Sequence, residues 1–146
     1  MNVVRKLPVG VVGEIADSSL QRVLMKTVGT GASVEIGSVV TETNGVIAQG
    51  GTGAYAGIAI SPKQLAKTGL TKSMTVPAGG SCEVMSFGRV WVKVASAVTA
   101  GAPAFYASNG TISAATGGGN TAIPRSKFLT GATGATGDVV ALLELS

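Results

Sequence analysis

The 146-residue sequence contains no histidine and a single cysteine. Without histidine, the ordinary Ser-His-Asp and Cys-His catalytic arrangements and histidine metal sites are excluded. The seven acidic residues lie far apart along the chain, so a pair of catalytic carboxylates would depend on the fold bringing them together. Cys82 has no partner for an intramolecular disulfide, and we expect it to be a small buried hydrophobic residue. We therefore expect no enzyme activity, no cofactor and no metal site.

Charged residues are also scarce. Asp, Glu, Lys and Arg make up 12% of the chain, while hydrophobic residues make up 45%. This charged fraction is about half the usual share of a soluble domain, and charge is depleted at protein interfaces. We therefore expect much of the surface to contact other protein; the alternative is a secreted β domain that uses hydroxyl groups in place of charge.

The net charge of +4 does not by itself indicate nucleic-acid binding. The Lys and Arg residues are scattered, with no dense basic run, and only six aromatic residues are available for base stacking. No specific nucleic-acid partner is expected. Residues 1–8 have no continuous apolar core, so we expect no signal peptide, and the uncharged stretches 43–62 and 95–124 are too rich in Gly, Thr, Ser and Asn for a membrane span. We expect a soluble chain made in a cytoplasm.

Hydrophobic patterning and turn residues predict an all-β protein. The 22 glycines are spread along the chain, which is typical of short strands joined by tight turns. Asn109 and Gly110 give the strongest hairpin signal, for a type I′ turn, and Asn44 with Gly45 predicts another turn. Strands are expected at residues 20–28 (where a helical face also fits), 33–41, 45–49, 57–60, 73–76, 83–87, 87–94, 126–129 and 138–145, with a hairpin at residues 104–112. We predict a single-domain β-sandwich or barrel, jelly-roll-like.

Two segments depart from this pattern. Residues 1–13 read as an extended N-terminal arm, which leaves residues 14–146 as a single β-rich domain. Residues 61–69 predict one short helix, with Ser61 as N-cap, Pro62 at the first helical position and Gln64 completing a capping box. Residues 51–56 match a Gly-x-Gly-x-x-Ala dinucleotide fingerprint, but a strand pattern follows where a helix is required, so they are interpreted as a loop.

The clearest two-faced strand is residues 87–94. Val90, Val92 and Val94 share one face, which we expect to enter the core. The other face carries Phe87, Arg89, Trp91 and Lys93. A tryptophan between two cations is the composition of an interface anchor, although burial of Trp91 under a second sheet fits equally well. In residues 139–145 both faces are apolar, which indicates a central strand or one covered by a partner.

Two further segments are candidates for contact with a partner. Phe128 and Leu129, next to Arg125 and Lys127, form one patch, for which a solvated edge is the alternative. The N-terminal arm can add as a strand to a neighbour's sheet. The alternative for the arm is a loose terminus. The full set of candidate interface residues is Val3, Val4, Arg5, Leu7, Arg89, Trp91, Lys93, Lys127 and Phe128.

The order of short motifs resembles the cement, or head-decoration, proteins of tailed bacteriophages. These motifs are residues 13–17 (Gly-Glu-Ile-Ala-Asp), 35–40 (Glu-Ile-Gly-Ser-Val-Val), 56–60 (Ala-Gly-Ile-Ala-Ile), 76–79 (Val-Pro-Ala-Gly), 88–94 (Gly-Arg-Val-Trp-Val-Lys-Val), 98–106 (Val-Thr-Ala-Gly-Ala-Pro-Ala-Phe-Tyr) and 126–129 (Ser-Lys-Phe-Leu). The resemblance implies a β-rich sandwich or barrel that binds the outer face of an expanded capsid lattice, as a dimer or trimer, where capsid subunits meet.

From the resemblance we expect a structural virion protein on the outer surface of the phage head, synthesised in the cytoplasm of the bacterial host. Its partners would be the major capsid protein and copies of itself, with no membrane and no cofactor. The alternative is a host-binding adhesin or small fibre domain, which would require an exposed aromatic cluster for glycan stacking. A biotinyl or lipoyl carrier domain would need a lysine at a hairpin tip, where this chain has Asn109 and Gly110.

Overall fold

The computed structural model describes residues 12–13, 15–16, 20–60, 75–132 and 140–146. The secondary structure of these residues is entirely β. The predicted helix at residues 61–69 and residues 1–11 of the predicted arm lie outside this part. The described strands are β1 (Arg22–Val28), β2 (Val34–Glu35), β3 (Val39–Thr43), β4 (Val46–Gln49), β5 (Ala54–Ile60), β6 (Thr75–Val76), β7 (Ser81–Lys93), β8 (Phe105–Tyr106), β9 (Ile112–Ser113), β10 (Thr121–Ala122), β11 (Ser126–Phe128) and β12 (Val140–Leu145).

Five strands close into a small barrel. They pair in the order β1-β4-β3-β5-β7, and β7 pairs back with β1 in antiparallel fashion, so the ring is complete. β3 and β4 form a hairpin whose turn residues Asn44 and Gly45 both have positive φ, at 52° and 82°, as a type I′ turn requires. Small aliphatic side chains fill the barrel, among them Val28, Val40, Ile47, Ala59 and Val84.

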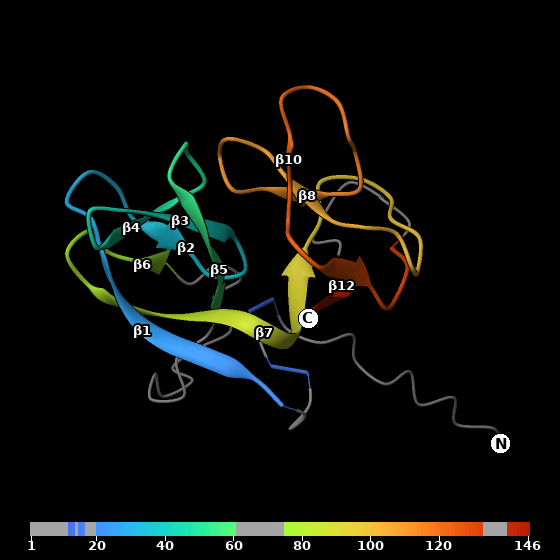
Figure 1. Cartoon of the computed structure of the whole chain (residues 1–146), viewed down its shortest axis with the longest axis horizontal. Helices are drawn as coiled ribbons and strands as arrows, with labels where there is room; N and C mark the ends of the chain where they lie inside the picture. Colours follow the sequence, from blue (N-terminus) through green and yellow to red (C-terminus); the bar gives the residue numbers. More distant parts are fainter. Residues whose placement is uncertain (1–11, 14, 17–19, 61–74, 133–139) are drawn as a thin grey trace, which may run out of the picture.

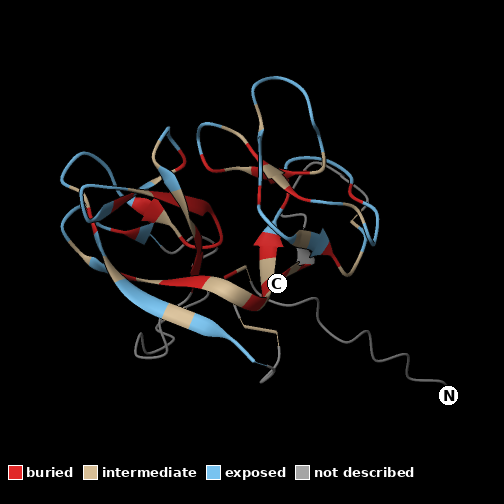
Figure 2. Cartoon of the chain, in the orientation of Figure 1, coloured by how far each residue is buried: buried red, intermediate tan, exposed pale blue. Residues whose placement is uncertain are grey.

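A second half packs against the outside of this barrel (Figure 1). The C-terminal part of β7 pairs with β12, which pairs with β11, and β10, β8 and β9 form a separate three-stranded sheet above them. The side chains between these layers form a second, larger core (Figure 2). It contains Val90, Val92, Val94, Ile112, Tyr106, Phe128, Leu143 and Leu145 from this half, and Val39, Ile58 and Met85 from the outer side of the barrel.

β7 belongs to both halves. Its first residues pair with β1 and β5 and its last residues pair with β12, and the change occurs near Gly88. Gly88 has a φ of 125°, and a Cβ atom there would lie 3.1 Å from the Cβ of Gln21. Glycine therefore allows the chain that enters β1 to cross closely over β7.

The loop at residues 108–110 joins the second half to the barrel. Gly110 accepts a hydrogen bond from the amide of Val39 (3.0 Å), and the carbonyl of Ser108 accepts one from the amide of Gly51 (2.7 Å). The side-chain amide of Gln49 donates to the carbonyl of Asn109 (2.9 Å). Hence this turn is both a hairpin end and a docking element.

The structure confirms the predicted all-β sandwich or barrel class and the alternation at residues 87–94, where all three valines are buried. It also confirms a strand at residues 20–28 and a central position for β12. The type I′ turn at Asn109 is wrong, because only Gly110 of the pair has positive φ. Ala107 and Thr111 flank a three-residue loop, in which Gly110 supplies the left-handed residue.

Candidate protein interface

The described residues contain no group of three or more His, Cys, Asp or Glu side chains that could hold a metal ion. Cys82 lies inside the barrel, 1% exposed. Burial, followed by the nearby charge of Glu83, raises the pKa of its thiol to about 11. A thiol in this state is largely protonated near neutral pH, so Cys82 acts as a hydrophobic side chain, as the sequence predicts.

The outer face of the C-terminal part of β7 carries Arg89, Trp91 and Lys93. The valines between them are buried, so strand alternation directs these three side chains away from the second core. Trp91 is half-buried and stands opposite Leu142 of β12, while Lys93 is exposed. Trp91 is therefore neither fully solvated nor completely buried under a second sheet.

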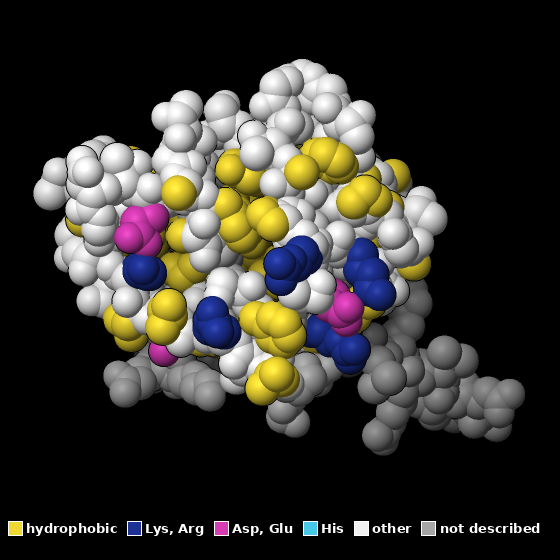
Figure 3. All heavy atoms as spheres, in the orientation of Figure 1, with side chains coloured by type: hydrophobic (Ala, Val, Ile, Leu, Met, Phe, Trp, Pro, Cys, Tyr) yellow, Lys and Arg dark blue, Asp and Glu magenta, His cyan; other side chains and the backbone are white. Residues whose placement is uncertain are grey.

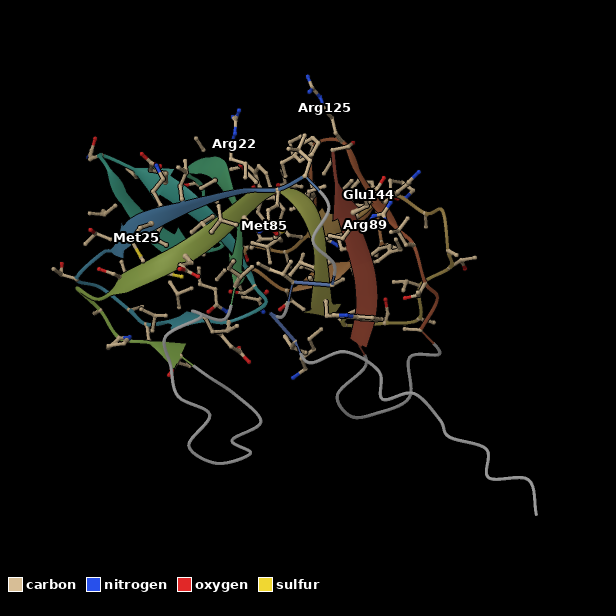
Figure 4. All side chains as sticks on the ribbon, turned by 90° about the horizontal axis from the view of Figure 1, so that it is seen from below. Arg22, Met25, Met85, Arg89, Arg125 and Glu144 are labelled. Atoms are coloured by element: carbon tan, nitrogen blue, oxygen red, sulfur yellow. The ribbon has the colours of Figure 1, made fainter. Side chains whose placement is uncertain are left out.

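Glu144 of β12 interacts with two basic residues at this face. Its carboxylate accepts a hydrogen bond from Arg89 Nε at 3.0 Å and lies 3.7 Å from Lys127 Nζ of β11. Figure 4 shows Arg89 and Glu144 side by side on adjoining strands. Pairs as exposed as these contribute at most about 1 kcal/mol to stability, so their main effect is to fix the positions of charges on the surface.

Within the predicted patch at residues 125–129, the structure places Lys127 and Phe128 on opposite sides of β11. Lys127 is exposed, whereas Phe128 is completely buried in the second core. Strand alternation explains the separation, because neighbouring residues of β11 point in opposite directions. Phe128 is therefore unavailable as a contact residue on the surface of this chain, which corrects the prediction for that residue.

The segment that leads from the predicted arm lies along the free edge of β7. The amide of Gly13 donates to the carbonyl of Trp91 (2.7 Å), and the amide of Ala16 donates to that of Arg89 (3.0 Å). Ile15 forms an antiparallel bridge with Val90. The predicted interface residues Val3, Val4, Arg5 and Leu7 lie outside the described residues, but the chain that follows them runs beside Trp91.

An apolar surface that the sequence analysis did not single out lies along β1. Leu20, Leu24 and Met25 are 80%, 53% and 61% exposed. β4 pairs with β1 only at Thr27 and Val28, so the earlier residues of β1 have only β7 as a described neighbour strand. The sequence offered one signal for this exposure. Leu24 and Met25 are successive apolar residues in a predicted strand, so they point to opposite faces of it.

Hydrophobic and basic side chains alternate across one face of the molecule (Figure 3). They lie over β1, over β7 and toward β11 and β12. All six aromatic residues fall in the described part of the chain, and each is buried or half-buried. No described helix is long and apolar enough to cross a membrane. The face is suited to contact with protein through small apolar patches flanked by cations.

Comparisons with known proteins agree with this arrangement. A chain in the capsid of Myoviridae phage XM1 shares 20% sequence identity with this protein and superposes with a TM-score of 0.71, over 99% of this chain and 94% of that chain. At this identity the likeness shows a common fold. No curated protein sequence matches the chain significantly. The model of the structural cement protein family (E217 gp24/Pam3 gp6) matches residues 1–146. The chain therefore belongs to the structural cement protein family of bacteriophages.

Proposed function

We propose that the protein binds the outer surface of the expanded phage head and stabilises the lattice of the major capsid protein. The family match over the whole chain carries this proposal, and it accounts for a virion location and a structural role. The finer parts, namely the expanded lattice, the outer face and the assembly of copies into a dimer or trimer, rest on what cement proteins do. Synthesis in the host cytoplasm follows from the same role.

The surface of the chain supports a protein partner. Charge is scarce, and in the described part of the chain the exposed large apolar residues are Leu24 and Met25 of β1, Leu20 just before it, and Val46 of β4. Burying such side chains contributes about 25 cal/mol per Å² of apolar area removed from water. Trp91 lies at the centre of a face bordered by Arg89 and Lys93, which is the composition expected of an interface anchor.

Stabilisation follows from linkage. A protein that binds the assembled lattice but not the free subunits shifts the equilibrium toward the lattice, by an amount that grows with its concentration relative to Kd. When one unit contacts several subunits, the later contacts form at high effective concentration, so individually weak contacts add up. The protein needs no steering by a large charge, in keeping with its low charged fraction.

The adhesin alternative has less support. A glycan-binding surface would offer exposed aromatic rings for stacking, and none of the six aromatic residues is fully exposed.

Co-sedimentation with capsids tests the proposal. The purified protein is mixed with expanded and unexpanded capsids of its own phage, and bound protein is measured as a function of concentration. We expect saturable binding to expanded capsids and a higher temperature of capsid rupture. Absence of binding to both forms would overturn the proposed function.

Two variants locate the contact. We propose that Trp91 and the N-terminal arm contribute most, so Trp91→Ala and deletion of residues 1–8 should each lower capsid occupancy while the isolated protein stays folded. Phe105→Ala is the control, because it removes a half-buried aromatic ring from β8, outside the proposed interface. Unchanged occupancy in both test variants would remove these segments from the interface.

A further inference from the structure

A surface cleft lies where the chain enters β1. Its volume is about 520 Å³, and its lining includes Leu20, Gln21, Arg22, Phe87, Arg125 and Ser146. These residues come from the start of β1, from the bend of β7, from the turn before β11 and from the residue after β12. Both halves of the protein thus contribute walls to one cleft.

The cleft depends on the backbone around it. Gly88 permits the close crossing of Gln21 over β7, which places Leu20 and Arg22 beside Phe87. On the opposite wall, the amide and the hydroxyl of Ser146 both donate to the carbonyl of Arg125, at 3.0 and 2.9 Å. The two walls are therefore held by specific contacts.

Within the described part of the chain, the two arginines of the cleft have no acidic side chain as a partner. Among the described cations, Lys26 pairs with Glu42 at 2.7 Å, and Arg89 and Lys127 share Glu144. No carboxylate side chain lines the cleft beside Arg22 and Arg125, and neither guanidinium has a hydrogen bond or ion pair within the described part of the chain. Figure 4 shows both side chains projecting from the same side of the molecule, from separate elements.

The backbone at Arg125 is unusual as well. Its φ of 51° lies in the left-handed region, which is unfavourable for a residue with a Cβ atom. Glycine or asparagine would adopt this conformation more readily. Strained residues of this kind cluster at ligand-binding sites, where the strain serves to aim a side chain.

The chemistry of the cleft selects its ligand. Arginine presents a planar fork of donors that matches a carboxylate, and Leu20 and Phe87 add apolar surface to the lining of the same cleft. We propose that this cleft binds an acidic segment of the capsid partner, in which carboxylates are flanked by apolar side chains. The capsid as the source of that segment rests on the proposed function, whereas the preference for an acidic peptide does not.

Nucleic acid fits the cleft less well. Among the described residues, only two cations, Arg22 and Arg125, line the cleft. The remaining described Lys and Arg residues lie elsewhere, either in ion pairs or on the outer face of β7. Binding to duplex DNA generally requires several contacts to successive phosphates. Leu20, at 80% exposed, would remain in water beside a phosphate backbone but would be covered by an apolar peptide side chain.

Peptide titration tests the cleft without a capsid. Amide NMR spectra of the isolated protein are recorded with a capped Leu-Glu-Glu-Leu peptide, with its Leu-Gln-Gln-Leu counterpart and with a short DNA duplex. We expect saturable shifts at residues 20–22, 87 and 125 with the acidic peptide and at least tenfold weaker effects with the glutamine peptide. Equal response to both peptides, or tighter binding of DNA at these residues, would overturn the proposal.

Capsid binding then tests the source of the segment. The double variant Arg22→Gln with Arg125→Gln should bind expanded capsids at least about tenfold more weakly and with less dependence on salt, while its thermal unfolding is unchanged. Arg22→Lys with Arg125→Lys keeps the net charge but lacks the planar forks, so it should show a partial loss. If both variants bind capsids as tightly as the wild type, the cleft proposal alone is overturned. If the wild-type protein binds no capsid, the proposed function is overturned, and the peptide titration still decides whether the cleft binds acidic peptides.

Discussion

The barrel and the second half of the protein are built in different ways. In the barrel, five strands form a closed ring of backbone hydrogen bonds around small side chains, mostly Val, Ala and Ile. In the second half, β12 and β11 extend from one side of β7 and a separate three-stranded sheet covers them. That half is joined across its core by larger side chains, including Tyr106 and Phe128.

This difference in construction indicates which interactions stabilise each half. Closure of the barrel satisfies the backbone of its strands through pairing, so the loss of one small side chain leaves the ring of hydrogen bonds in place. The layers of the second half are joined by individual backbone hydrogen bonds, such as that from the amide of Ala95 to the carbonyl of Ile112 (2.9 Å), and by burial of the apolar side chains of the second core. We therefore expect the largest effects from substitutions in the second core, and intermediate effects where the halves meet.

Phe128→Ala should cause the largest loss of stability. The side chain is completely buried between the layers of the second half, and truncation of a buried Phe typically costs about 3–5 kcal/mol. Urea unfolding at neutral pH measures the change in the free energy of unfolding. Ile47→Val, at an equally buried site in the barrel, is the comparison and should cost about 1 kcal/mol. The contrast between the two halves is tested by Ile112→Val in the second core, because it removes the same methyl group as Ile47→Val from an equally buried site and should cost more; equal costs of these two variants would contradict it.

Gly50→Ala should break the junction between the halves. Gly50 has a φ of 61°, and a Cβ atom there would lie only 2.3 Å from the carbonyl oxygen of Ser108, which belongs to the docked turn. We expect a loss of about 2–3 kcal/mol, because the left-handed backbone strain adds to the displacement of the turn. Gly31→Ala is the control, since nothing lies within 4 Å of its added Cβ. Thermal unfolding of both variants decides the matter, and identical midpoints would refute the docking role.

High pH should weaken the barrel core by a smaller amount. The pKa of Cys82 is raised from 9.0 to about 11 in the folded protein, so the unfolded chain loses its thiol proton first as the pH rises. The free energy of unfolding should therefore fall by about 1 kcal/mol between about pH 8 and pH 10.

Urea unfolding at several pH values measures how the free energy of unfolding falls with pH. In Cys82→Ala, the part of this fall that is due to the thiol should be absent. Burial also raises the pKa of the Tyr55 phenol above its ordinary value, which adds a similar loss at still higher pH. The comparison of the two proteins cancels the contribution of Tyr55. An unchanged slope in Cys82→Ala would show that the thiol is not the group responsible.

Local features of the fold could be predicted from the sequence. The alternation at residues 87–94 placed Val90, Val92 and Val94 in the core, because a half-buried strand imposes a period of two. The turn at Asn44 and Gly45 followed from the residues that tolerate positive φ. These signals arise from neighbours along the chain, so they survive without knowledge of the tertiary structure.

Other features depend on contacts between distant residues. The loop at Asn109 takes a three-residue form, and its carbonyls contact Gln49 and Gly51 of the barrel. Likewise, the sequence places Phe128 in a surface patch, whereas β12 and the covering sheet enclose it in the core of the folded protein. The cleft at Arg125 is lined by residues from four separate segments, so no single stretch of sequence predicts it.

The sharing of β7 has a consequence for the order in which the chain folds. All five barrel strands have been translated by residue 93, so the barrel is able to close while the C-terminal strand is still absent. β12 joins β7 only after residues 140–145 have been made, and pairings between residues so far apart in sequence form slowly. Until then Val90, Val92 and one edge of β7 stay uncovered, and exposed apolar side chains beside an unpaired strand edge promote aggregation.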